Sequence, residues 1–237
     1  MTPTLVLFGT EHALALAVTA AGAVAMVLWA RRLRRAFHAR RLRHVLATLM
    51  VVLVVVYFVV LWHEGTLDKE AAPLHLCDLA VFLGVHALFT MNQVSFELLY
   101  FWAFAGTSMA ILTPDLDASY PDWRFFTYFG MHGLVVVSAA VLTFGLGMRP
   151  REGAPWRVLL FTNVYALLVA GVNVVFGTNF MYLSRKPPTE TPLDWLGPWP
   201  YYLIAAEGIA LAMFWLLDLP FRIGGRKTRG VNAPNRA

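Results

Sequence analysis

Composition places this chain among membrane proteins. Of its 237 residues, 59% are hydrophobic and only 14% are charged, whereas a soluble domain typically has about 45–50% apolar and about 25% charged residues. The apolar positions amount to roughly seven spans of about 20 residues, the length that crosses a bilayer core. A single cysteine excludes an intrachain disulfide framework. The net charge of +5 favours no partner until the basic residues are located.

Seven long apolar stretches, each bounded by charges, Pro or Gly, predict an all-α polytopic membrane protein that forms a single integral domain over 1–237. They lie at about 12–30, 45–62, 74–90, 98–113, 125–147, 158–182 and 199–219. The third, LHLCDLAVFLGVHALFT, contains two His, a Cys and an Asp. These are too many polar groups for a lipid-facing helix, so we expect it inside the bundle.

Lys and Arg sort to one side of these spans. The segment 31–43, RRLRRAFHARRLR, is expected to be a loop with seven Arg, and the loop 148–157 and a basic tail at 222–237 follow on the same side. That side holds fifteen of the nineteen Lys and Arg. The positive-inside rule therefore predicts an outside amino terminus and a cytoplasmic carboxyl terminus. Arginines directly after a span favour topology and anionic-lipid contact over nucleic-acid binding.

Polar side chains from five of the predicted helices lie at a similar depth, near the outer surface, when depth along each helix is estimated from a rise of about 1.5 Å per residue. They are His63, His75, Cys77, Asp78, His132, Asn173, Asn179 and Glu207. Such groups inside a bilayer cost free energy and are functional candidates for that reason. The inner level has fewer, chiefly His86 and Asn163. We therefore expect a polar cavity that opens outward and admits a reagent from the outer leaflet.

Most of these residues also have a purely structural interpretation. A lone Cys in an apolar helix is usually a small hydrophobe, and Glu207 needs a partner or a raised pKa. The other structural interpretations are an interfacial position for His12 and His63, a packing role for His86, and interhelical hydrogen bonds for Asn173 and Asn179.

Helical phase suggests which histidine serves Cys77. His75 and Asp78 are three residues apart and share a face, whereas Cys77 is rotated about 200° from His75. The base must therefore come from another helix, where His132 has a suitable depth. An imidazole that takes the thiol proton would give a thiolate able to attack an ester carbonyl and form a thioester.

Five segments together resemble the YwaF family of bacterial integral membrane proteins. They are PLHLCDLA at 73–80, the turn Pro114–Asp115, FFTYFGMHG around His132, GTNFMYLSRKP ending at Pro187, and LGPWPYY at 196–202. This family is similar to an animal membrane acyltransferase that moves fatty acyl chains into ether phospholipids, and more remotely to membrane hydrolases of fatty-acid esters. The resemblance covers about 45–220 and implies a multi-pass protein of the bacterial cytoplasmic membrane. In the acyltransferase branch the implied site residues are a cysteine in an HLCD-like motif and a later histidine, which match Cys77 and His132.

These observations predict a lipid acyltransferase or acyl hydrolase that works at the outer leaflet without a metal or organic cofactor. Cys77 would attack the acyl ester of a phospholipid, and a lysophospholipid or water would resolve the thioester. His132 would act as base and then as acid. His75, Asn173 or Asn179 would donate a hydrogen bond to the oxyanion of the tetrahedral intermediate. Asp78 could orient His75, and Glu207 would line the site.

Two other classes of function stay open. A transporter, receptor or lipid-binding protein would use the same polar cavity, with Glu207 and the histidines as proton or ligand sites, although no span has the paired Gly or Pro break typical of transporters. Alternatively, His63, His75 and His132 could ligate zinc or haem, but the sequence has no HxxxH or CxxC spacing.

Overall fold

The computed structural model describes residues 5–33, 35–187 and 191–229, and these residues form an all-α bundle. The α-helices are α1 (Thr10–Arg32), α2 (Ala36–Glu64), α3 (Leu76–Thr90), α4 (Gln93–Phe101), α5 (Ser108–Leu112), α6 (Trp123–Ala140), α7 (Ala154–Phe176) and α8 (Tyr201–Arg229). Two π-helical segments, η2 (Trp102–Thr107) and η3 (Val141–Gly145), join α4 to α5 and extend α6. Short 3-10 turns lie at Lys69–Ala71, Phe180–Tyr182 and Pro192–Leu196.

Six helical segments of the described chain are long and apolar enough to cross a membrane. They are Thr10–Arg32, Ala36–Glu64, Gln93–Leu112, Trp123–Gly145, Ala154–Phe176 and Tyr201–Ile223. The helix α3 is equally apolar but has only 15 residues, about 22 Å of helix, which is less than the thickness of a bilayer core. The prediction of an all-α polytopic membrane protein is confirmed, but in the described residues six of the seven predicted spans, not all seven, are long enough to cross a membrane.

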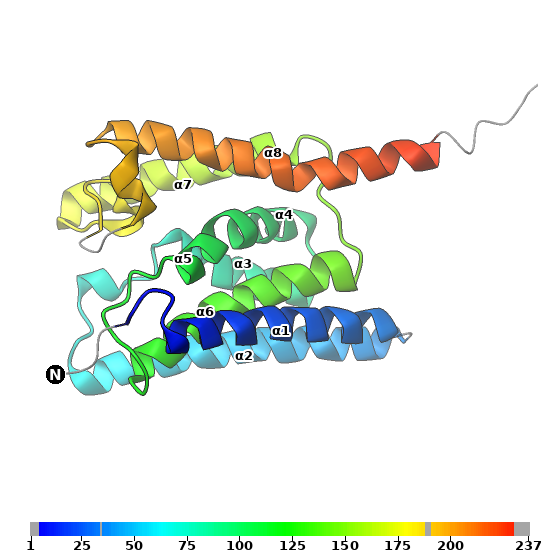
Figure 1. Ribbon diagram of the computed structural model, residues 1–237, viewed down its shortest axis with the longest axis horizontal. Helices are drawn as coiled ribbons and strands as arrows, with labels where there is room; N and C mark the ends of the chain where they lie inside the picture. Colours follow the sequence, from blue (N-terminus) through cyan, green and yellow to red (C-terminus); the bar gives the residue numbers. More distant parts are fainter. Residues whose placement is uncertain (1–4, 34, 188–190, 230–237) are drawn as a thin grey trace, which may run out of the picture.

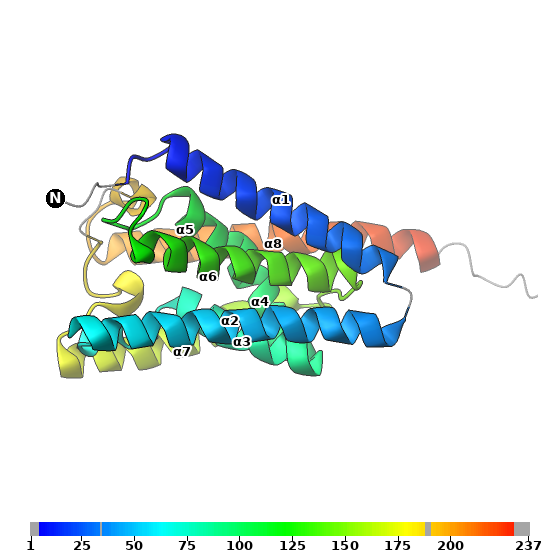
Figure 2. The ribbon, with the colours of Figure 1, turned by 90° about the horizontal axis from the view of Figure 1, so that it is seen from below.

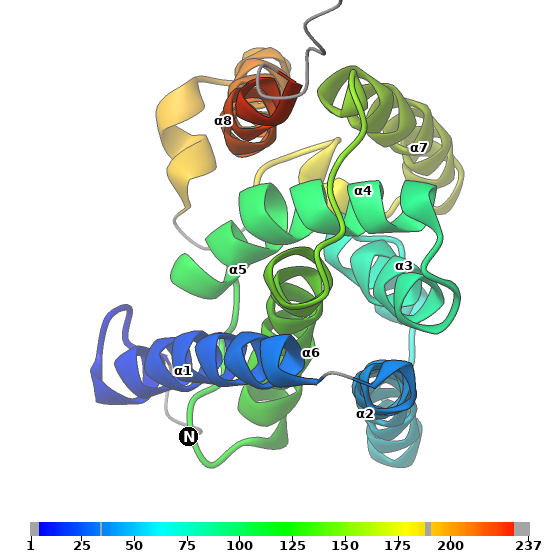
Figure 3. The same cartoon turned by 90° about the vertical axis from the view of Figure 1, so that its right-hand side faces the viewer.

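The helices form three layers (Figures 1 and 3). The pair α7 and α8 makes one outer layer, α3, α4 and α5 lie in the middle, and α1 and α2 lie on the opposite side. Helix α6 lies between α1 and α2 when seen from below (Figure 2) and packs against both, as well as against α3 and α4. The short helix α3 contacts α2, α4 and α6, so it lies inside the bundle as its polar residues predicted.

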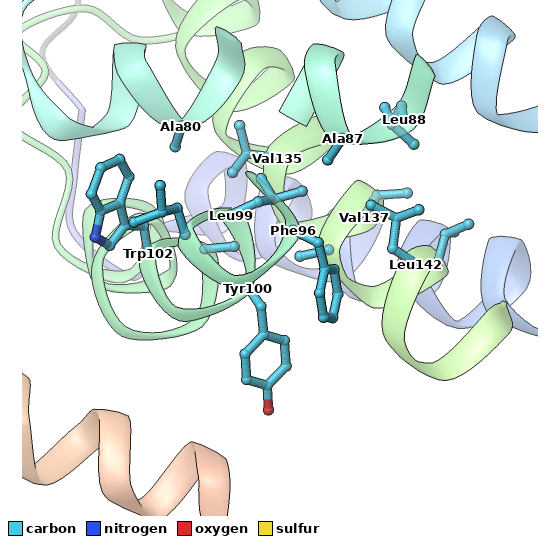
Figure 4. Close-up of a cluster of buried hydrophobic side chains, with 14 of the residues drawn as sticks. Ala80, Ala87, Leu88, Phe96, Leu99, Tyr100, Trp102, Val135, Val137 and Leu142 are labelled. Atoms are coloured by element: carbon cyan, nitrogen blue, oxygen red, sulfur yellow. The ribbon is translucent and has the colours of Figure 1, made fainter. Parts of the chain in front are cut away.

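The core lies where α3, α4 and α6 meet, and its side chains interdigitate in Figure 4. The labelled residues are Ala80, Ala87, Leu88, Phe96, Leu99, Tyr100, Trp102, Val135, Val137 and Leu142, all buried. At Gly84 a Cβ atom would lie only 2.9 Å from Cε of Met50, so this glycine lets α3 approach α2 closely. The peripheral helices α1, α2, α7 and α8 instead expose long apolar faces, as expected of surfaces that contact lipid.

The two ends of the bundle carry opposite charge. At the end where α1 begins, here called the acidic end, lie Glu64, Asp68, Glu70, Asp115, Asp117, Asp122 and Asp194. The opposite, basic end holds Arg31, Arg32, Arg35, Arg40, Arg41, Arg43, Arg149, Arg151, Arg157 and Arg222. Trp62, Trp195, Trp199 and Tyr201 are exposed at the acidic end, where aromatic side chains favour a membrane interface. Which end faces the cytoplasm stays a prediction.

Several predicted boundaries were wrong. The Arg-rich segment 31–43, expected to be a loop, is mostly helical: α1 runs to Arg32 and α2 starts at Ala36. The reason is that arginine is a good helix former. The fourth span starts at Gln93, five residues earlier than predicted, because the Asn92 side chain caps α4. The sixth ends at Phe176, because Gly177 adopts a left-handed conformation with φ 65°.

The predicted tail at 222–237 overlaps the last helix. Helix α8 continues to Arg229, and residues 230–237 lie outside the described residues. Only the first part of the tail can therefore be placed, at the basic end of the bundle (Figure 1).

Candidate functional site

The first turn of α3 and the middle of α6 bring four of the predicted site residues into the part of the bundle nearer the acidic end. His75 is the residue before α3, and Cys77 and Asp78 lie in its first turn. His132 lies on α6, which packs directly against α3. Two loops lie beside them: the segment between α7 and α8, whose Met181 N–H donates to His75, and the segment between α5 and α6, whose Asp115 accepts the Tyr182 hydroxyl.

Tyr128 stacks on His132 and lies near Cys77. The half-buried Cys77 thiol is free and lies within electrostatic range of the Tyr128 hydroxyl. The Tyr128 ring stacks on the His132 ring with centroids 4.2 Å apart and planes 26° apart. His132 in turn lies within electrostatic range of His75. The predicted cysteine and both histidines therefore belong to one cluster.

The hydrogen bond made by His132 determines which ring nitrogen can act as a base. Its Nδ1 lies 2.8 Å from the Tyr128 carbonyl oxygen, four residues earlier in α6. Since a carbonyl oxygen only accepts, Nδ1 must carry the hydrogen. In the neutral ring Nε2 is then the unprotonated nitrogen, which is the form a general base requires.

His75 is held in the opposite tautomer. The backbone N–H of Met181 donates to its Nδ1 at 3.3 Å, so in the neutral ring the hydrogen is on Nε2. The ring lies between Phe180 and Tyr182, with centroid distances of 5.5 and 5.4 Å. Asp78, expected to orient this ring, instead accepts the His75 backbone N–H at 3.0 Å. Its role in the structure is to cap α3.

Asn173 and Asn179 hold the loop that carries Met181. The buried Asn173 amide donates to the Phe180 carbonyl at 3.0 Å, and its oxygen accepts the Phe180 N–H at 2.9 Å and the Thr178 hydroxyl at 2.9 Å. Asn179, which the sequence placed in a helix, lies in this loop and makes three bonds to the backbone of 184–185. Both side chains are thus engaged with the backbone beside the cluster.

The same loop contains two strained residues. Met181 and Tyr182 adopt left-handed conformations with φ 57° and 52°, which cost free energy for residues with a Cβ. The Asn173 and Asn179 bonds offset this cost, as does a hydrogen bond from the Tyr202 hydroxyl to the Tyr182 carbonyl. Such over-determined strain is typical of functional loops.

Tyr182 and Asp115 are members of the cluster that sequence reasoning missed. The Tyr182 hydroxyl donates to Oδ2 of Asp115 at 2.5 Å, and the Cys77 thiol lies within its electrostatic range. Burial, together with the nearby Asp115 carboxylate, raises the pKa of the Tyr182 hydroxyl above its ordinary value, so it stays a donor at neutral pH. Both residues lie in motifs that carried the resemblance, but a tyrosine at a helix end gave no separate signal.

Comparison with known sequences adds a family to this geometry. A model described as the TMEM164 family matches residues 7–218, which include the whole cluster. The chain belongs to the TMEM164 family. An uncharacterized protein of Treponema pallidum (strain Nichols) is 32% identical to it over 165 residues, which cover 67% of this chain and 66% of that relative. No solved structure matches.

Glu207 of this TMEM164 family member lies on another part of the bundle. Its carboxylate accepts a hydrogen bond from Nδ2 of Asn163, on the neighbouring helix α7. The sequence placed these two residues at different depths, and the structure pairs them at one level between α7 and α8. Glu207 thus has the polar partner that an intramembrane carboxylate requires.

Three other histidines lie apart from the cluster. His63 is exposed at the end of α2, as expected of an interfacial residue. The interfacial position expected for His12 was wrong: its ring is fully buried, and Nε2 donates to the Ile111 carbonyl at 2.8 Å. His86 is hydrogen-bonded to Ser95 at 2.7 Å. Within the described ranges no group of three or more His, Cys, Asp or Glu is placed to hold a metal ion.

Proposed function

We propose that this protein transfers or hydrolyses the acyl chains of membrane phospholipids or lysophospholipids, with Cys77 as nucleophile and His132 as general base. The observation that carries this proposal is the cluster near the acidic end, where Tyr128 lies near the chain's single cysteine and stacks on a histidine whose Nε2 is free of hydrogen in the neutral ring. TMEM164 family membership supports a membrane role but names no reaction.

In the first half-reaction His132 Nε2 takes the proton of the Cys77 thiol, and the thiolate attacks the acyl ester carbonyl. The Nε2–H of His75 donates to the oxyanion of the tetrahedral intermediate. When the intermediate collapses, the ester C–O bond breaks and the lysolipid oxygen leaves with the proton now on His132. The acyl chain remains as a thioester on Cys77.

In the second half-reaction His132 removes a proton from the hydroxyl of a lysophospholipid or from water, and that oxygen attacks the thioester. The C–S bond breaks, and the thiolate of Cys77 is reprotonated by His132. An acceptor lipid gives transfer and water gives hydrolysis. Neither half-reaction requires a metal or an organic cofactor.

The position of the cluster suits a lipid ester. Cys77, in the first turn of α3, lies near the acidic end, where exposed tryptophans mark a membrane interface, and phospholipid ester groups lie at such an interface. The orientation predicted from the arginines places this end at the outer leaflet of a bacterial cytoplasmic membrane. We propose that the lipid enters laterally from that leaflet.

Thioester trapping tests the proposal. Purified protein in nanodiscs is incubated with a phospholipid that carries a radiolabelled acyl chain, and protein-bound label is measured before and after neutral hydroxylamine, which cleaves thioesters. We expect hydroxylamine-sensitive label on wild type and none on Cys77→Ala. Cys77→Ser should retain a little label that resists hydroxylamine, because an oxyester replaces the thioester.

Two histidine variants provide a matched comparison. His132→Gln should slow labelling at least about a hundredfold, the usual contribution of a general base. His63→Gln, an exposed histidine at the same end, should label as fast as wild type. Equal labelling of wild type and Cys77→Ala would refute the assignment. Unchanged cellular function of Cys77→Ala would favour the non-enzymatic transporter or lipid-binding alternative.

A further inference from the structure

The basic end carries a surface groove on α2 that is separate from the candidate site. It is lined by Phe37, Arg40, Arg41, His44, Val45, Thr48 and Leu49. The first four residues lie near the start of the helix, and the last three lie deeper along it. At 1.5 Å per residue the groove runs about 18 Å along α2, cationic at its mouth and mainly apolar below.

The arginines of this region differ in their contacts. Arg31 donates to the Phe144 carbonyl at 2.7 Å, and Arg43 donates to the Leu88 carbonyl at 2.6 Å, so these two stabilise helix ends. Arg40 and Arg41 are exposed, and in the described part of the chain neither makes a hydrogen bond or an ion pair. Arg40 instead lies close enough to Arg43 for their like charges to interact. The mouth of the groove therefore has uncompensated positive charge.

We propose that this groove binds one anionic phospholipid of the leaflet at the basic end. Arg40 and Arg41 would bind its phosphate, since guanidinium groups donate to phosphate oxygens in pairs. An acyl chain would lie against Val45, Thr48 and Leu49. The order of charges and apolar residues along α2 matches that of a phospholipid, with the headgroup at the helix start. A soluble phosphate would leave the apolar part of the groove unfilled.

Spin-labelled lipids in nanodiscs test this proposal. The motionally restricted fraction is measured for phosphatidylglycerol and for phosphatidylcholine with the same labelled chain. Wild type should prefer phosphatidylglycerol. Because a hydrogen bond to a charged group contributes about a tenfold gain in affinity, Arg40→Gln/Arg41→Gln should lower the preference at least about tenfold.

Matched variants separate a site from a general field. Arg32→Gln/Arg35→Gln removes the same charge from exposed arginines that do not line the groove, and should keep most of the preference. Arg40→Lys/Arg41→Lys keeps the charge and should keep at least half, which also shows that the position tolerates change. Equal losses in the two glutamine pairs, no preference in wild type, or full displacement by inorganic phosphate would each overturn the proposal.

Discussion

Glu97→Gln is expected to destabilise the bundle without touching the candidate site. Glu97 lies in α4 at the basic end and is 2% exposed. Its carboxylate accepts the Arg151 backbone N–H at 2.8 Å and Arg151 Nε at 2.9 Å, and Arg157 forms a second ion pair at 3.1 Å. These bonds join α4, the loop before α7 and α7 itself.

The size of the effect follows from burial. Removal of one partner from a buried ion pair costs about 3–5 kcal/mol. The side chains of Arg151 and Arg157 are 50% and 38% exposed, so water solvates them after the change and reduces the cost. The glutamine oxygen also still accepts some of the hydrogen bonds. We therefore expect a loss of about 2–4 kcal/mol.

The assay is the fraction of monodisperse protein that remains after heating in detergent. For a chain of this size about 2–4 °C is lost per kcal/mol, so the midpoint should fall by about 4–16 °C. The control is Glu64→Gln, which changes the same charge at an exposed residue with one hydrogen bond from Trp123, and should shift the midpoint by no more than about 2 °C. Equal midpoints for the two variants would refute the reasoning.

Three further predictions concern the acidic end. Asn173→Ala should lower the free energy of unfolding by about 2–3 kcal/mol, because three buried hydrogen bonds disappear, and it should also slow thioester labelling. Asn163→Ala should leave labelling unchanged, and equal labelling rates for the two variants would contradict this. The folded-state pKa of Tyr182 lies above its ordinary value because of burial and Asp115, so the stabilisation that its hydroxyl provides is present below about pH 10 and is lost as pH rises. The difference in thermal midpoint between wild type and Tyr182→Phe should therefore be smaller at pH 11 than at pH 9, and a constant difference would argue against it. Asp122→Ala removes the side chain that caps α6 and should cost about 1 kcal/mol by chemical denaturation, with no change if the cap is unimportant.

Hydropathy and charge were sufficient to predict the six long spans, though not all of their boundaries, the interior position of α3 and the opposite charge of the two ends. The buried position of Glu97 could not be predicted in this way. A hydropathy window treats an acidic residue as the edge of a span, and the fourth span is therefore predicted to begin at 98. The partners of Glu97 are 54 and 60 residues away along the chain. No local pattern relates a carboxylate to arginines at such a separation, although together they make its burial possible.

The depth of each polar residue was also easier to predict than its partner. Asn173, Asn179 and Asp78 were expected beside a substrate, and all three bind backbone groups. In a membrane an unpaired backbone N–H or C=O costs several kcal/mol, so nearby polar side chains are drawn to helix ends and loops. A polar residue near the end of a predicted span is thus as well suited to capping as to catalysis.

The roles proposed for the two histidines depend on backbone groups of opposite polarity. The Tyr128 carbonyl of α6 gives His132 the tautomer of a base, and the Met181 N–H gives His75 the tautomer of a donor. The Tyr128 carbonyl belongs to a continuous helix, whereas the Met181 amide points toward His75 only while the loop keeps its left-handed residues. If Asn173 and Asn179 released that loop, His75 could exchange its hydrogen between nitrogens and lose the donor role. The bonds of these two asparagines to the backbone therefore support the proposed chemistry indirectly, because they keep the base and the donor distinct.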